Sequence, residues 1–180
     1  MPYRCIFSIV VVDAAAQRPC LSVLSTDAVD VVRNAGGLIC DRVRLGWRVT
    51  VLIPAGEDTR SLRILGADVA DIDAPPDGLR DRRSALVASA ALYANDRAAR
   101  SEVESALATK TTEVLVWGAA LPPQLDHGSK AVSYRLSNAA QAFKAQALIA
   151  LGLPLEDSST EAFRTKCARD LIARELDVAG

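Results

Sequence analysis

Four side chains of this sequence have the chemical character needed for acid–base or metal chemistry near strand ends: Asp13, Asp71, Asp73 and His127. Carboxylates spaced as in Asp71-x-Asp73 project to one side of a strand and can hold Mg²⁺ beside a phosphoryl substrate. His127 is the only histidine, so any imidazole general base must be this residue. We therefore predict Asp13, Asp73 and His127 as candidate catalytic residues, and Asp71 with Asp73 as a candidate metal site.

Each of these candidates also has a simpler structural explanation. The acidic pair fits a strand that runs out into a polar loop. A phosphatase-type site would need a second acid two residues after Asp13, and the sequence has Ala15 there. His127 lies beside Asp126 in a segment rich in Pro and Gly, and no G-x-S-x-G elbow supplies a nucleophile. A histidine in an exposed loop therefore explains His127 without catalysis.

The turn at 54–59 leads from an apolar run into a helix start, where free N–H groups can hold an anion. Gly56 and Thr59 of this turn, together with Asp73 and Trp117, are the candidate cofactor-binding residues. The turn contains one glycine, two acidic residues that would repel a phosphate, and neither G-x-G-x-x-G nor G-x-x-x-x-G-K-[ST]. No particular cofactor is indicated.

The elements that must position these residues alternate between strands and helices. Apolar runs predict four strands, at 6–12, 49–53, 69–72 and 113–117. The segment 13–25 is expected to be a loop that can include a short strand at 21–24. Apolar spacing and capping residues predict helices at about 26–45, 59–65, 79–93, 95–107, 137–151 and 159–175. The last of these is expected to begin at a capping box, Ser158-Ser159-Thr160-Glu161.

This order predicts an α/β fold: a single three-layer Rossmann-like domain over residues 1–180, with a mostly parallel sheet of about four strands flanked by helices. The helices at 137–151 and 159–175 are expected to pack on it. If the strands are parallel, their carboxyl ends meet at one edge, where open α/β sheets bind ligands. Asp13, the 54–58 turn, Asp73 and the 117–128 segment would then face a common crevice.

Gly36 and Gly37 lie inside the helix predicted at 26–45, where each costs about 1 kcal/mol relative to Ala. Close packing of the helix backbone is the simpler explanation for the pair. A bend in the helix, or a ligand that touches it, is the alternative.

Composition limits the partners. Half of the residues are apolar, which argues against disorder, and the formal net charge of −1 makes nucleic acid a poor default ligand. The cluster Arg80, Arg82 and Arg83 on the helix predicted at 79–93 keeps nucleic-acid binding as an alternative. The Ala-rich helix at 137–151 is expected to be a central helix or a homodimer interface.

The four cysteines show no metal-binding spacing and are expected to be reduced thiols of a cytoplasmic protein. Residues 1–16 have features of a short signal peptide, but the β-branched residues at 9–12 favour a strand. No segment has the roughly 20 apolar residues of a membrane-spanning helix.

These observations lead us to predict a cytoplasmic bacterial module that binds a protein partner or a small ligand and is not an enzyme. The first alternative is a small enzyme, or a nucleotide- or Mg²⁺-binding protein, that uses the crevice at the strand carboxyl ends. The second is nucleic-acid binding through the arginine-bearing helix.

Overall fold

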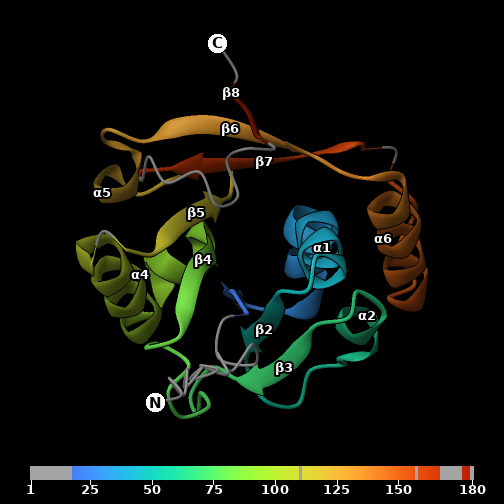
Figure 1. Ribbon diagram of the computed structural model, residues 1–180, viewed down its shortest axis with the longest axis horizontal. Coiled ribbons are helices and arrows are strands. Elements are labelled where there is room, and N and C mark those ends of the chain that lie inside the picture. The colour runs from blue at the N-terminus through green and yellow to red at the C-terminus, as the bar shows by residue number, and fades with distance from the viewer. Residues whose placement is uncertain (1–17, 110, 157, 167–175, 179–180) are drawn as a thin grey trace, which may run out of the picture.

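An eight-stranded mixed sheet forms the centre of the computed structural model, in the order β3-β2-β1-β4-β5-β7-β6-β8 (Figure 1). The structure describes residues 18–109, 111–156, 158–166 and 176–178, so the strand predicted at 6–12, Asp13 and residues 167–175 lie outside the described residues. The strands are β1 (Cys20–Leu24), β2 (Arg48–Ile53), β3 (Asp68–Asp71), β4 (Arg83–Ser89), β5 (Glu113–Trp117), β6 (Lys130–Arg135), β7 (Thr160–Thr165) and β8 (Leu176–Val178). The helices are α1 (Ala28–Arg44), α2 (Arg60–Ile64), α3 (Ala90–Asn95), α4 (Arg97–Thr109), α5 (Pro123–Asp126) and α6 (Asn138–Ala150).

The prediction of an α/β fold is confirmed, but the sheet is larger and more mixed than predicted. β3, β2, β1, β4 and β5 are parallel neighbours. β7 then pairs antiparallel with both β5 and β6, and β6 pairs antiparallel with β8. The short strand considered at 21–24 is β1, and it lies at the middle of the parallel half.

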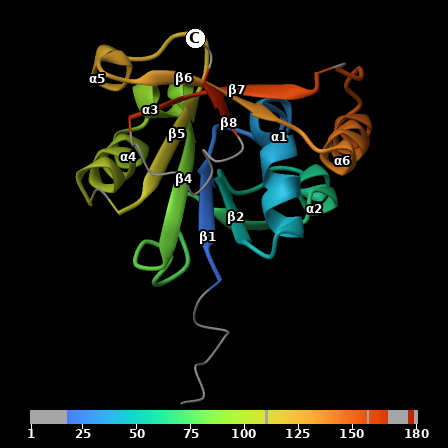
Figure 2. The ribbon, with the colours of Figure 1, turned by 45° about the horizontal axis from the view of Figure 1, so that its top comes forward.

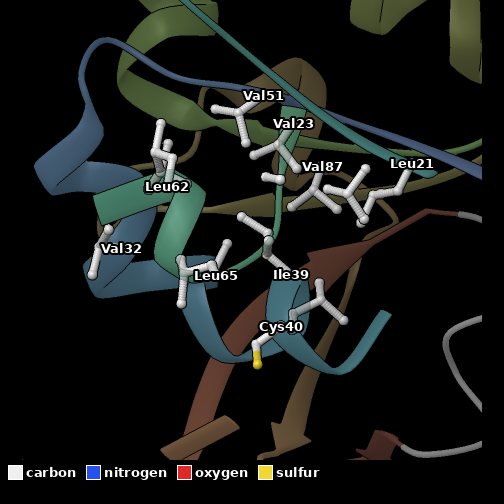
Figure 3. Packing of buried hydrophobic residues seen from close by; sticks show 14 of the residues in the cluster. Leu21, Val23, Val32, Ile39, Cys40, Val51, Leu62, Leu65 and Val87 are labelled. Carbon is white, nitrogen blue, oxygen red and sulfur yellow. The ribbon is translucent and has the colours of Figure 1, made fainter. Parts of the chain in front are cut away.

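Helices cover each side of the sheet (Figure 2), and β1, β2, β4 and β5 are largely buried, whereas the edge strand β3 is partly exposed. On one face, Val23, Val51 and Val87 belong to the core cluster that also contains residues of α1, α2 and α6 (Figure 3). On the other face, Leu24 and Leu86 belong to a second cluster with residues of α3 and α4. Successive strand residues therefore alternate between two apolar layers, which is why the strands read as continuous apolar runs.

The prediction of a helix at 79–93 is wrong. Residues 83–89 form β4, a strand between β1 and β5, and the helix α3 begins only at Ala90. Because both faces of β4 are covered, its apolar run has no period of two, and a short run of this kind cannot be distinguished from a buried helix by pattern alone.

The arginine-bearing helix face proposed for nucleic acid therefore does not exist. Arg83 is on β4 and pairs with Glu102 at 2.6 Å, and Arg80 contacts the same carboxylate at 2.6 Å. Arg82 donates to the backbone carbonyls of Asp77 and Gly78. These interactions engage all three guanidinium groups within the fold.

The helix predicted at 159–175 is also wrong in the part that the structure describes, because residues 160–165 form β7. Glu161, Phe163 and Thr165 are buried and alternate with more accessible residues, as on a strand. Glu161 concealed this alternation, since a charged residue is not expected to face inward. By contrast, the helices at 26–45 and 137–151 are confirmed as α1 and α6.

The carboxylate of Glu161 lies against the middle of α1. It accepts hydrogen bonds from the backbone N–H groups of Gly37 at 2.7 Å and Leu38 at 2.9 Å. Lys144 of α6 contacts the same carboxylate at 2.8 Å and donates to the carbonyl of Arg33. In an uninterrupted helix the Gly37 N–H would bond to the Arg33 carbonyl. Here Glu161 accepts from the Gly37 N–H and Lys144 donates to the Arg33 carbonyl, so the buried ion pair provides a partner for each of these two backbone groups.

Burial raises the pKa of the Glu161 carboxyl, while Lys144 and the two backbone N–H groups oppose the rise. Three hydrogen bonds, one from each of three residues, therefore offset the cost of removing this carboxylate from water.

Gly37 allows the close approach that the sequence indicated. A Cβ atom at this position would lie 2.3 Å from two carbon atoms of the buried Leu136 side chain. At Gly36 the nearest neighbour would be Leu65 Cδ1 at 3.4 Å. Of these two glycines, only Gly37 is therefore required by packing.

None of the helices in the described ranges is long and apolar enough to cross a membrane.

We predict that Glu161→Ala lowers the free energy of unfolding by about 3–5 kcal/mol, because Lys144 would be left buried without a counter-charge. The matched control is Glu156→Ala, which removes an accessible carboxylate that contacts Arg33 at 3.1 Å and should cost about 0–1 kcal/mol. Urea denaturation measures both changes. Equal effects of the two substitutions would contradict a special role for Glu161.

We predict opposite outcomes for the two adjacent glycines. Gly37→Ala should cost about 1–3 kcal/mol, because the added methyl group overlaps Leu136 in a filled core. Gly36→Ala should leave stability unchanged or increase it by up to about 1 kcal/mol, since alanine favours the helix. Thermal unfolding of both variants tests this contrast, and a Gly36→Ala variant that is the less stable of the two would refute it.

Candidate functional site

The strand order identifies one edge of the sheet as the place to look for a site. The chain continues from β1 to β2 on one side, whereas β4 lies on the other side of β1, so the order reverses between β1 and β4. In open α/β sheets, ligands bind beyond the strand carboxyl ends at such a reversal. The residues that follow β1 there are Ser25, Thr26 and Asp27.

A network of hydrogen bonds converges on Asp30 at this edge. Its carboxylate accepts from the Ser25 hydroxyl at 2.7 Å, from the Asn34 amide at 2.9 Å and from the indole N–H of Trp117 at 3.2 Å. Ser25 directly follows β1, Trp117 ends β5, and Asp30 and Asn34 are in the first two turns of α1. We call Ser25, Asp27, Asp30, Asn34 and Trp117 the Asp30 cluster.

Asp27 places a second carboxylate beside the first. It is the N-cap of α1 and accepts the backbone N–H of Asp30 at 2.7 Å. Its other oxygen accepts from the exposed hydroxyl of Thr26 at 3.1 Å. Both carboxylates are half-buried at the N-terminus of α1, which is the positive end of its helix dipole.

A hollow of about 410 Å³ has one lining residue in common with the Asp30 cluster, Asn34. It lies among Arg33 and Asn34 of α1, Gly118 and Ala119 after β5, and the start of β7. Gly118 has a φ of +130°, and a Cβ atom there would lie 2.9 Å from the Cβ of Ala90, so only glycine fits without strain. A substrate in this hollow would meet polar groups from three segments of the chain.

The arrangement can hold and exchange protons. The Asp30 carboxylate is fully engaged by neutral donors, while one Asp27 oxygen faces only the Thr26 hydroxyl among the described residues. Asp27 is therefore the better placed of the two to accept a proton from water. Among the residues that the structure describes, no three His, Cys, Asp or Glu side chains are grouped so that they could hold a metal ion.

The structure separates the candidate residues that the sequence indicated. Gly56, Thr59 and Asp71 line an open hollow of about 520 Å³ beside β2 and β3. Asp73 lines a different hollow, together with Leu24 and Leu52 of the opposite sheet face. Asp71 and Asp73 were expected to project to the same side, but β3 ends at Asp71 and the backbone N–H of Asp73 turns back to bond to the Asp71 carboxylate at 3.1 Å.

The remaining candidates lie farther along the sheet. Trp117 is buried, with 2% of its surface exposed, so neither ring face is available for a planar ligand. His127 is exposed at the end of α5. Its neighbours Asp126 and Ser129 both accept hydrogen bonds from Arg164 rather than from His127. Asp13 lies outside the described residues. The candidates that the structure describes lie in separate places and do not assemble into one site.

In the sequence, Asp27 and Asp30 are two acidic residues at the start of a predicted helix, which explains them without a site. The signal that points to a site is the strand just before them, because a carboxylate pair that directly follows a central parallel strand lies at the ligand-binding edge. The expected strand at 6–12 drew attention to Asp13 instead.

No protein-family model and no curated protein matches this sequence. Solved structures do share its fold. The A40926 pseudoaglycone deacetylase Dbv21 is 13% identical, with a TM-score of 0.56 over 82% of this chain and 96% of that one. A deacetylase of teicoplanin biosynthesis, solved in complex with teicoplanin, is 14% identical, with a TM-score of 0.54 over 81% and 97%.

The 4-carboxy-2-hydroxymuconate hydratase GalB of Pseudomonas putida KT2440 is 15% identical, with a TM-score of 0.50 over 84% of this chain and 97% of that one. At these identities the likeness establishes a common fold. All three of these similar proteins are enzymes, which contradicts the prediction of a non-enzymatic binding module.

We predict that Asp30→Asn destabilises the protein by about 1–3 kcal/mol, because an amide group would present N–H donors to the buried donors of Ser25 and Trp117. Asp73→Asn, at an exposed carboxylate, should change stability by less than about 0.5 kcal/mol. Thermal unfolding compares the two. A larger loss of stability for Asp73→Asn than for Asp30→Asn would contradict this prediction, because the stabilising polar contacts would then lie near β3.

Proposed function

We propose that this protein is a small enzyme that adds water to its substrate at the Asp30 cluster. The observation that carries the proposal is the pair of half-buried carboxylates, Asp27 and Asp30, directly after β1 where the strand order reverses. The named activities of the similar structures support it, since deacetylation is the hydrolysis of an acyl group and a hydratase adds water to a double bond.

In the hydrolytic reaction, the Asp27 carboxylate removes a proton as a water oxygen attacks the acyl carbon. The C–N or C–O bond to the leaving group then breaks, and the proton passes from Asp27 to the departing atom. In hydration, the water oxygen bonds to one carbon of the double bond and the proton is delivered to the other. Asp30 is a positioning residue, because its carboxylate holds Ser25, Asn34 and Trp117 in place.

The strand order 3-2-1-4-5 of the parallel half supports a Rossmann-like arrangement within a single domain. We also propose a cytoplasmic location, because the two cysteines in the described part of the chain, Cys20 and Cys40, are buried free thiols.

A homodimer formed through α6 remains a proposal. Phe143 and Ile149 on this helix have 42% and 54% of their surfaces exposed, which supports an apolar contact with a second copy.

Two panels of probes test the proposed reaction. The first contains p-nitrophenyl acetate and p-nitroacetanilide, and the second contains conjugated unsaturated carboxylic acids. We expect turnover in one panel and a loss of about 100-fold or more in kcat for Asp27→Asn, because general-base catalysis contributes about 10²–10⁴-fold.

The matched control is Asp58→Asn. Asp58 is also a carboxylate at a helix start, where it accepts the backbone N–H of Arg60 at 3.0 Å, but it is exposed near the far edge of the sheet. Activity should be unchanged in this variant. Wild-type activity in Asp27→Asn would exclude Asp27 as the base, and no turnover of either panel would count against the proposed reaction.

A further inference from the structure

The hollow that Asp73 lines has a volume of about 280 Å³ and lies on the sheet face opposite α1. Its floor is apolar and consists of Leu24, Leu52 and Ile72 at the ends of β1, β2 and β3. One wall is α4, and the other is the connection between β3 and β4. It shares no lining residue with the hollow beside the Asp30 cluster.

The hollow exists because this face is unevenly covered. α3 and α4 belong to the apolar cluster that covers β4 and β5, whereas the region over β1 and β2 is covered by the connection at 72–82. That connection contains two consecutive prolines and forms no helix or strand. The apolar ends of β1 and β2 are therefore left as the floor of a cavity.

A buried ion pair lies at the inner end of the hollow. Arg83 of β4 and Glu102 of α4 approach to 2.6 Å, and their side chains are only 5% and 10% exposed. Arg83 also donates to the Ser22 hydroxyl at 3.0 Å. Because Arg83 has both of these partners, it is anchored in the wall and holds one oxygen of Glu102.

The second oxygen of Glu102 is available to a ligand. Oε2 is buried and has no hydrogen-bond donor in correct geometry among the described residues. Its charged neighbour is Arg80, whose Nη2 lies 2.6 Å away on a side chain that is 73% exposed. Since a solvated guanidinium gains little from such a contact, Arg80 can be displaced from this oxygen at small cost.

The charge of the lining selects the sign of the ligand. Two guanidinium groups and five carboxylates line the hollow, so its formal charge is negative; the carboxylates belong to Asp73, Asp77, Asp81, Asp96 and Glu102. The N-terminus of α4 also lies here, but Asp96 already accepts the backbone N–H of Ala99 at 2.6 Å. A second anion at this helix end would face that carboxylate, which disfavours an anionic ligand.

We propose that this hollow binds a small organic amine with a compact apolar body. The ammonium group donates to Glu102 Oε2 in place of Arg80, and the apolar body covers Leu24, Leu52 and Ile72. The bound amine thereby replaces the solvent-accessible Arg80 contact with a donor that can align on Oε2, while Arg83 retains the other oxygen.

The test compares benzylammonium with its neutral and anionic counterparts, benzyl alcohol and benzoate, by isothermal titration calorimetry and by methyl chemical shifts of Leu24 and Leu52. We expect benzylammonium alone to bind and to shift these methyl signals. Arg80→Ala should tighten its binding by about tenfold, because Glu102 Oε2 no longer has to be released first.

The matched control is Arg60→Ala, which removes another exposed arginine that contacts a carboxylate, Asp58, at 2.7 Å. Its affinity for benzylammonium should equal that of the wild type. Glu102→Gln should weaken binding by at least about tenfold, and Arg80→Ala serves as the decisive variant should Glu102→Gln unfold. Tighter binding of benzoate, equal affinities in Arg80→Ala and Arg60→Ala, or no binding of any probe would each overturn the proposal.

Discussion

The contact between Glu161 and the middle of α1 joins the two halves of the molecule. The parallel half of the sheet packs on α1, and β7 belongs to the antiparallel half, yet the Glu161 carboxylate bonds directly to α1 backbone N–H groups. Lys144 brings α6 to the same point. One buried charge pair therefore fixes how a helix, a strand and a second helix meet. Near the C-terminal end of α1, Asp41 accepts a hydrogen bond from the Tyr134 hydroxyl at 3.0 Å, so α1 holds the antiparallel half at two points.

The elements that could be predicted are those bounded by clear turn or capping residues. α1 begins at a capping aspartate, and β2 and β5 are short apolar runs bounded by turns. β4 could not be distinguished from a helix, because it is covered on both faces and so has no period of two, and because it runs into α3 at Ala90 without an intervening turn. β7 was missed for a different reason. Its inward-facing Glu161 is satisfied only by groups that are distant in sequence, and no local pattern reveals them.

The candidate site shows the same division between local and distant information. The sequence directed attention to the strand carboxyl ends, but the crevice depends on which strands are neighbours. Asp71 on β3 and Trp117 on β5 are separated by four strand spacings, about 19 Å, and so cannot share a small substrate. Asp27 and Asp30 lie at the reversal only because β4 inserts between β1 and β5. This order is set by the packing of the whole sheet rather than by any residue near the site.

The position of β6 has a consequence for the newly synthesised chain. β6 emerges from the ribosome before β7, but its neighbours in the sheet are β7 and β8, both of which follow it in sequence. Until β7 has been translated and has paired with β5, β6 therefore presents two unpaired backbone edges. The first five strands can assemble vectorially, whereas completion of the sheet must await release of the C-terminal region. A ribosome stalled before Thr160 would leave a nascent β6 open to intermolecular pairing.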